Sequence, residues 1–179
     1  MKIKLIYRKP KPEFNSIENV FDTLLPFLKV EKITLPFFSS GYSARKKNIQ
    51  FVKSLATKLI HITGYDHYLL LGLKNKKTIL TIHDVEVLNR NKGLKRFILK
   101  KIWFDIPIKH AHTVTTISNF SKKEILNLNN YNTPIEVIYN PITLPIKFKP
   151  KVFNLEEPTI LHIGTKENKN LNRLILALQ

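Results

Sequence analysis

Two patterns of apolar residues alternate along the chain, and each is typical of one kind of secondary structure. Short runs rich in Ile, Val, Leu and Thr have the length of buried strands, whereas longer stretches place apolar residues three and four positions apart, as amphipathic helices do. The runs predict strands at residues 2–7, 30–35, 61–64, 78–82, 112–117, 135–139 and 159–163. The longer stretches predict helices that begin near Asn15, span 44–60, begin at Gly93 with an interruption near Pro107, and begin at Ser121 and Asn170.

This alternation of strands and helices indicates βαβ units. We therefore expect an α/β fold with a mostly parallel sheet and helices on both faces. In such sheets, ligands bind beyond the carboxyl ends of the strands. The candidate site residues are those at or directly after the predicted strand ends: His61, Gly64, His83, Asp84, Ser118, Asn119, Asn140, Gly164 and Thr165.

The chain has 179 residues, enough for one ordinary domain and too few for two full-sized ones. Residues 142–157 are rich in proline and lysine, as extended linkers are. We expect a domain over 1–145, a linker over 146–157 and the start of a second domain over 158–179. One strand and one partial helix cannot bury a sheet on their own, so the second domain is expected to be incomplete.

Composition narrows the classes of function. Without cysteine, the chain has neither a disulfide framework nor a thiolate nucleophile or metal site. No apolar run has the 18 or so residues that a membrane span needs, and residues 1–7 do not resemble a secretory signal. The 30 Lys and Arg against 13 Asp and Glu give a net charge of +17, which invites a polyanion. A basic nucleic-acid-binding α/β module is the alternative reading, but no helix-turn-helix, RNP or zinc signature occurs, so no nucleic-acid partner is expected.

His83 and Asp84 directly follow the predicted strand at 78–82, which is rich in β-branched residues. The imidazole either contacts a ligand at the edge of the sheet or only caps the strand, and Asp84 either orients it or begins a turn. No second histidine stands at ligand spacing, so no metal site is expected. His61 is a further cleft candidate, whereas His67, His110 and His112 receive no role.

Small and polar residues end three other predicted strands. Gly64 either lets a ligand approach the backbone or forms a plain turn. Ser118 and Asn119 open a helix whose amides attract anions, although helix capping by itself explains the serine. The turn from Gly164 to Asn170 has a hydroxyl group, lysines and a helix N-terminus, which suit a diphosphate.

Four segments in order are more specific than any one of them. They are residues 78–84 (TILTIHD), 115–125 (TTISNFSKKEI), 137–141 (VIYNP) and 161–171 (LHIGTKENKNL). With this order the chain resembles, over nearly its whole length, the group 1 glycosyltransferases, family 4, of the GT-B fold. The resemblance implies two Rossmann-like domains, of which residues 1–145 are the acceptor side and 158–179 the first βα unit of the nucleotide-sugar side.

The resemblance also implies an activity. A hexose passes with retained anomeric configuration from a nucleotide-sugar co-substrate to a saccharide or lipid-linked acceptor, in cell-surface polysaccharide or glycolipid synthesis, without a metal or cofactor. His83, with Asp84 beside it, matches the histidine that contacts the donor sugar. The turn that meets the donor diphosphate is matched by Gly164, Thr165, Lys166, Lys169 and Asn170.

Three departures from the family pattern qualify these assignments. The loop after the first strand, Arg8–Asn15, has two prolines where the family is Gly-rich. Thr165 stands where many members have Arg, so Lys166 or Lys169 must supply the charge. The paired-glutamate segment that grips the donor would lie beyond Gln179, so we expect these 179 residues to be inactive by themselves.

The positive charge is concentrated in one third of the chain. Residues 41–101 contain 14 Lys and Arg against three acids. Within this part, the helix expected at 92–103 combines basic and apolar residues. It is either a surface that meets anionic lipid near a lipid-linked acceptor or a solvated helix. A cytoplasmic protein is expected, with peripheral attachment to the inner face of the membrane as the open alternative.

Overall fold

The computed structural model describes residues 3–11, 16–73, 75–142, 147–164 and 169–178. The chain divides into two compact units, residues 1–143 and residues 144–179. None of the helices in the described ranges is long and apolar enough to cross a bilayer.

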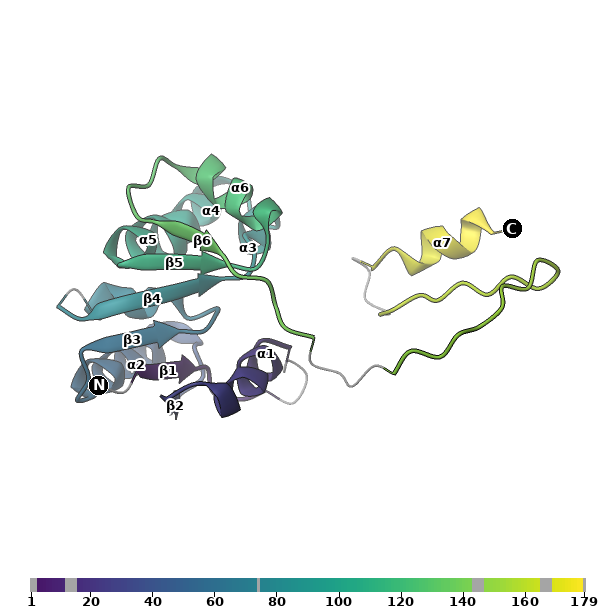
Figure 1. Cartoon of the computed structure of the whole chain (residues 1–179). Coiled ribbons are helices and arrows are strands. Elements are labelled where there is room, and N and C mark those ends of the chain that lie inside the picture. Colours follow the sequence, from purple (N-terminus) through teal and green to yellow (C-terminus); the bar gives the residue numbers. More distant parts are fainter. Residues whose placement is uncertain (1–2, 12–15, 74, 143–146, 165–168, 179) are drawn as a thin grey trace. The chain divides into compact units, whose positions relative to one another are not determined.

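The first unit is built on a six-stranded sheet in the order β2-β1-β3-β4-β5-β6, in which every neighbouring pair is parallel (Figure 1). The strands are β1 Ile3–Tyr7, β2 Val30–Thr34, β3 Leu59–Ile62, β4 Lys77–Ile82, β5 Thr113–Thr116 and β6 Ile135–Val137. The expected α/β fold with a parallel sheet is confirmed.

Helical segments connect these strands. They are α1 Ser16–Leu24, the 3₁₀ turn η1 Leu25–Phe27, α2 Gly41–Ser54, the 3₁₀ helix η2 His67–Gly72, α3 Glu86–Asn89, α4 Gly93–Leu99, the π-helix η3 Lys100–Asp105, α5 Ile106–His110 and α6 Asn119–Leu128. The start expected near Asn15 falls outside the described residues.

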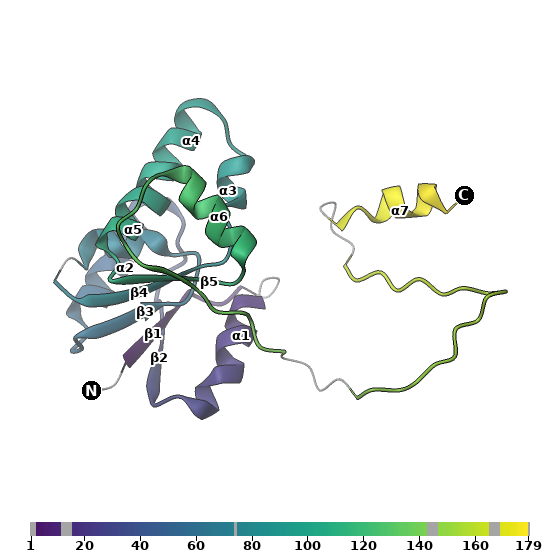
Figure 2. The same ribbon diagram turned by 45° about the horizontal axis from the view of Figure 1, so that its top comes forward.

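The helices cover both faces of the sheet, but unequally. Successive side chains of a strand point to opposite faces, and on β1 Ile6 belongs to the main core whereas Leu5 and Tyr7 belong to a smaller cluster with Phe21 of α1. The main core contains buried residues of α2, η2, η3, α5 and α6. Figure 2 shows α1 apart from these helices. The strand order explains this. The connection from β1 to β2 runs toward one edge of the sheet, and the later connections run toward the other edge. Because crossovers between parallel strands are right-handed, α1 and the later helices lie on opposite faces.

The helix expected over 44–60 is wrong at both ends. The helix α2 begins at Gly41, which has a φ of +72°, and ends at Ser54. Ile60 instead lies in β3, fully buried, between Lys4 of β1 and Thr78 of β4. A central parallel strand is apolar on both faces, so its spacing does not distinguish it from the end of a helix.

Pro107 does not interrupt the helical segment as expected. Helical structure is continuous from Gly93 to His110, because the turns at Lys100–Asp105 widen to a π-helix before Pro107 in the first turn of α5. The wider turn accommodates a residue that has no N–H to donate. The start expected at Ser121 is also wrong, since α6 begins at Asn119 after the N-cap residue Ser118.

The second unit contains the helix α7 Leu171–Ala177. The strand expected at 159–163 is not formed, and residues 147–164 have no regular secondary structure. A strand needs a neighbour that pairs with its backbone, and the described residues of this unit include no second strand.

Candidate functional site

His83 follows β4 directly and is held at two points. Its ring Nε2 donates a hydrogen bond to the Thr63 carbonyl oxygen at 3.0 Å, at the end of the neighbouring strand β3. Its own carbonyl oxygen accepts a hydrogen bond from the Ser121 hydroxyl at 3.0 Å. The Phe21 ring lies edge-on to the imidazole, with centroids 6.5 Å apart.

The His83 ring is neutral at pH 7. Burial lowers the pKa of this imidazole below its usual value, and the hydrogen bond to Thr63 and the charge of Asp84 only partly oppose that shift. Because Nε2 carries the proton that is donated to Thr63, Nδ1 has a lone pair. Nothing in the described ranges hydrogen bonds to Nδ1, so it can accept a hydrogen bond from a ligand.

Ser118 and Ser121 tie α6 to the end of β4. The Ser118 hydroxyl oxygen accepts the Ser121 backbone N–H at 3.1 Å, which is an N-cap interaction, and donates to the Ser121 hydroxyl oxygen at 3.1 Å. Ser118 therefore caps α6, and Ser121 in turn donates to the His83 carbonyl oxygen.

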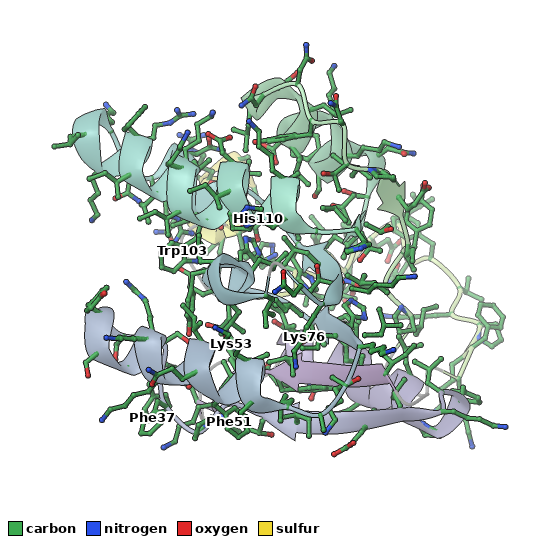
Figure 3. The ribbon with its side chains drawn as sticks, turned by 90° about the vertical axis from the view of Figure 1, so that its left-hand side faces the viewer. Phe37, Phe51, Lys53, Lys76, Trp103 and His110 are labelled. Carbon is green, nitrogen blue, oxygen red and sulfur yellow. The ribbon has the colours of Figure 1, made fainter. Side chains whose placement is uncertain are left out.

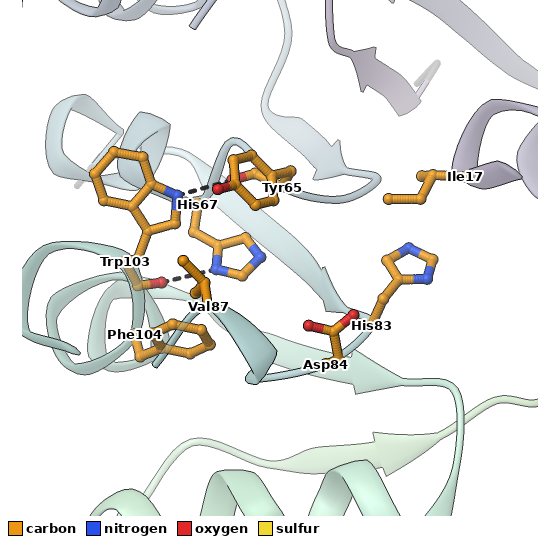
Figure 4. Close-up of a pocket in the computed structure, with 8 residues that line it drawn as sticks. All are labelled: Ile17, Tyr65, His67, His83, Asp84, Val87, Trp103 and Phe104. Atoms are coloured by element: carbon orange, nitrogen blue, oxygen red, sulfur yellow. Dashed lines mark hydrogen bonds between the residues drawn. The ribbon is translucent and has the colours of Figure 1, made fainter. Parts of the chain in front are cut away.

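Asp84 is exposed and forms the turn that precedes α3. Its Oδ1 accepts the Glu86 backbone N–H at 3.0 Å. The carboxylate also lines a hollow of about 50 Å³ beside His83, together with six other side chains (Figure 4). These are Ile17, Tyr65, His67, Val87, Trp103 and Phe104. None of the six was predicted as a site residue, and they come from four separate segments of the chain.

Gly64 is required for space rather than for a left-handed backbone. A Cβ at this position would lie 3.0 Å from Cγ2 of Ile17 and 3.5 Å from Cδ2 of His83. A side chain at residue 64 would therefore press on Ile17 in the first turn of α1, which lies close to the end of β3.

His61 is close to His83 but does not line the hollow. Its Nε2 bonds to the Thr81 hydroxyl at 2.7 Å, and Thr81 bonds to the Thr115 hydroxyl at 2.7 Å. Burial, with a smaller contribution from His83, lowers the pKa of His61 to about 4. These contacts give His61 a structural role on the face that α1 covers.

A smaller hollow adjoins the first and shares Ile17 and Tyr65 with it. Here Arg8 binds both carboxylate oxygens of Glu18, at 2.6 and 2.9 Å. The carboxylate of Asp66 is buried beside them, and its Oδ1 has no hydrogen-bond partner among the described residues. Burial raises the pKa of Asp66 above its usual value, and a hydrogen bond from Ser39 and the charges of Arg8 and Arg45 oppose that shift.

The remaining candidates are more exposed. Asn119 is exposed at the start of α6, where its amide donates to the Tyr139 hydroxyl at 3.3 Å, and Asn140 is exposed beyond β6. In the second unit, Gly164 has a φ of +98° and Asn170 a φ of +55°, and both are exposed, as is Lys169. Thr165 and Lys166 lie outside the described residues. The turn is thus described only at its two ends.

No cluster of three or more His, Asp or Glu side chains that could hold a metal occurs within the ranges that the structure describes.

Comparison with known proteins identifies one family. The model of Glycosyltransferase Family 4 matches residues 5–144, which is most of the chain. No curated protein sequence matches. A solved structure that is similar to this chain is the Anabaena protein Alr3699/HepE in complex with UDP and glucose, at 16% sequence identity and a TM-score of 0.49. The match covers 79% of this chain and 45% of that protein.

Proposed function

Because the chain belongs to glycosyltransferase family 4, we propose that its first unit is the acceptor side of a retaining glycosyltransferase. The enzyme moves a hexose from a nucleotide-sugar to a saccharide or lipid-linked acceptor. The single observation that carries the proposal is the position of His83, a neutral imidazole at the carboxyl end of a central parallel strand. No hydrogen-bond partner of its Nδ1 occurs among the described residues, so this atom can accept a bond from a ligand.

In the proposed reaction the bond between the anomeric carbon and the diphosphate oxygen breaks, and the diphosphate leaves with the electron pair. The acceptor hydroxyl attacks the same face, and its proton passes to the departing diphosphate. His83 orients the donor sugar through one of its hydroxyl groups, and Asp84 stands at the mouth of the same hollow. Lysines and helix amides at the turn 164–170 stabilise the leaving charge. The reaction as proposed needs neither a metal nor a cofactor.

A chimaera tests this proposal. Residues 1–145 are joined to the donor domain of a family member that has the paired glutamates, and transfer from its nucleotide-sugar is measured. We expect transfer with retained configuration, and a loss of at least about 100-fold on His83→Ala. The unjoined 179-residue chain should transfer nothing. An inverted product would overturn the retaining mechanism, and equal rates for the His83→Ala and unsubstituted chimaeras would overturn the role of His83.

One further observation favours attachment to a membrane. Leu94, Phe97 and Ile98 of α4 are 74%, 65% and 46% exposed and form an i, i+3, i+4 stripe that points away from the core. Lys95 of α4 and the N-cap residue Lys92 are also exposed. An exposed apolar stripe among cations is typical of a helix that lies in the surface of an anionic membrane. We propose that α4 holds the enzyme at the cytoplasmic face of the membrane, beside a lipid-linked acceptor in cell-surface polysaccharide or glycolipid synthesis.

A further inference from the structure

His67 lies in the wall of the hollow beside His83, and its protonation is set by a contact on its far side. Its Nδ1 is 2.7 Å from the carbonyl oxygen of Trp103 (Figure 4). A carbonyl oxygen only accepts hydrogen bonds, so Nδ1 carries the proton. In the neutral ring, Nε2 then has the lone pair.

The Trp103 carbonyl is available because of Pro107. In an α-helix, the carbonyl of residue 103 would accept the N–H of residue 107, and proline has none. The helix widens at Lys100–Asp105, and His67 from η2 supplies a donor to this carbonyl. Figure 3 shows Trp103 on the helical segment that ends at His110. The pairing therefore couples two segments that are 36 residues apart.

The ring has a fixed orientation and stays neutral. Phe104 packs against it at a right angle, with centroids 5.4 Å apart. Burial lowers the pKa of His67 to about 4, so the ring is uncharged at pH 7. No group in the described part of the chain hydrogen bonds to Nε2. The ring is one of the side chains that line the hollow, as are His83 and Asp84.

The hollow limits what Nε2 can bind. Its volume of about 50 Å³ suits a group of a few heavy atoms that enters from the open side of the hollow. Val87, Trp103 and Phe104 present carbon to it, and Tyr65, which is half exposed, stands on its rim. The fitting group has one O–H donor on a short carbon arm.

We infer that His67 is a specificity-determining residue that accepts a hydrogen bond at Nε2 from the hydroxymethyl group of a hexose substrate, whose carbon packs against Val87, Trp103 and Phe104. This inference rests on the proposed function. The hydroxymethyl group belongs to either the acceptor or the donor sugar. On both sugars this group offers the same O–H donor to Nε2 of His67.

The first experiment is ¹⁵N NMR of the histidines in the 179-residue chain. Without ligand, we expect the His67 ring at pH 7 to be protonated at Nδ1. On addition of methyl glycosides of glucose, galactose and mannose, or of UDP-glucose, the Nε2 resonance of His67 should shift. A response to the free glycosides assigns the acceptor sugar, and a response to UDP-glucose only assigns the donor sugar. UDP-glucose is also added to the chimaera, which has a complete donor domain. A ring protonated at Nε2, or no response to the glycosides and none to UDP-glucose in the chimaera, overturns the inference.

The 6-deoxy analogues supply the matched comparison. Each analogue lacks only the hydroxyl of the hydroxymethyl group, so the hexose that binds should bind about fivefold to tenfold more tightly than its analogue. His67→Asn retains a donor to the Trp103 carbonyl but lacks the outer nitrogen, and should bring this ratio to about one. His67→Gln places an amide oxygen near the Nε2 position, so it should restore part of the preference for the hexose over its 6-deoxy analogue. The exposed His112→Asn is the control and should keep the wild-type ratio.

A ratio that is unchanged in His67→Asn, or equal binding of hexose and analogue by the wild-type chain, overturns the inference. If His67→Asn does not fold, the wild-type ratio and the ring protonation decide. Failure of the proposed function is a different result. It would be seen as equal transfer rates for the His83→Ala and unsubstituted chimaeras.

Discussion

The hydroxyl group of Ser121 donates a hydrogen bond to the carbonyl oxygen of His83 across 3.0 Å, from the first turn of α6 to the end of β4. Ser121 is buried, and Ser118 bonds both its backbone N–H and its hydroxyl group. The position of the imidazole over the hollow thus depends on the start of α6, where Ser121 lies 38 residues further along the chain.

Ser121→Ala should therefore lower the free energy of unfolding by about 1–3 kcal/mol, because the His83 carbonyl loses its donor. Urea unfolding measures this. Ser54→Ala removes the hydroxyl of an exposed serine that donates to the nearby Phe51 carbonyl, and should change the free energy by less than about 0.5 kcal/mol. Equal effects of the two substitutions would contradict the anchoring role of Ser121.

Gly64→Ala should destabilise the first unit by about 1–2 kcal/mol, because the new Cβ approaches Cγ2 of Ile17 to 3.0 Å. The cost should be smaller in an Ile17→Ala background, where the opposing atoms are gone. A double-mutant cycle in urea should give a coupling of about 1 kcal/mol. Additive effects would show that the side chain at residue 64 meets a different obstacle.

Stability should fall in mild acid because burial lowers the folded-state pKa of His61, His67 and His83. Burial lowers the folded-state pKa of both His61 and His67 to about 4, whereas in the unfolded chain they titrate near 6.5. Between these values the unfolded state binds more protons, so the free energy of unfolding decreases as the pH falls from about 6.5 to about 4. The slope is at most about 1.4 kcal/mol per pH unit for each histidine. His61→Gln should lower this slope by up to about 1.4 kcal/mol per pH unit in urea unfolding measured across the range; a slope equal to wild type would refute the assignment.

The contribution of Asp66 to stability should depend on pH in the opposite direction to that of the histidines, and Asp66→Asn tests this. Burial raises the folded-state pKa of Asp66, so the folded state binds a proton more tightly than the unfolded state and the charged form destabilises the fold at neutral pH. The amide should therefore raise the thermal midpoint at pH 7. The gain should shrink as the pH falls through the folded-state pKa, where Asp66 itself becomes neutral. A variant that is less stable than wild type at pH 7 would indicate that the carboxylate charge is needed by Arg8 or Arg45.

The exposed stripe of α4 should bind anionic vesicles. Co-sedimentation with phosphatidylglycerol-containing vesicles should exceed that with neutral vesicles. It should weaken about fivefold on Lys95→Gln and further on Phe97→Ser. Lys109→Gln removes an exposed charge of α5, away from the stripe, and serves as the matched control. Equal binding to both kinds of vesicle would refute the membrane proposal.

Much of the fold was predictable because it depends on local patterns. The apolar runs located six of the seven predicted strands, and their alternation with helices indicated the parallel sheet. The carboxyl ends of the strands placed His83 and Gly64 at one edge. The predictions are wrong in two kinds of place. At Leu59 and Ile60 the apolar pattern fits both a helix end and a buried strand, and at residues 159–163 a strand would need a second strand to pair with.

His67 shows why the rest of the candidate site could not be predicted. It lies in a run, His67–Gly72, whose apolar residues fit neither period, and its partner Trp103 comes from another element. One signal in the sequence pointed toward it: Pro107 stands four residues after Trp103 and leaves a carbonyl without its helical donor. That signal indicates that a donor is needed, but it does not indicate which of six histidines supplies it.

The sequence by itself determined the parallel α/β fold, the family and the place of His83, because these follow from local periodicity and from motifs in a fixed order. Only the tertiary structure decided the protonation of His67, the reason for Gly64 and the second anchor of His83 at Ser121. Each of these is a contact between segments far apart in the chain, and such contacts depend on how the helices pack on the sheet rather than on any local pattern.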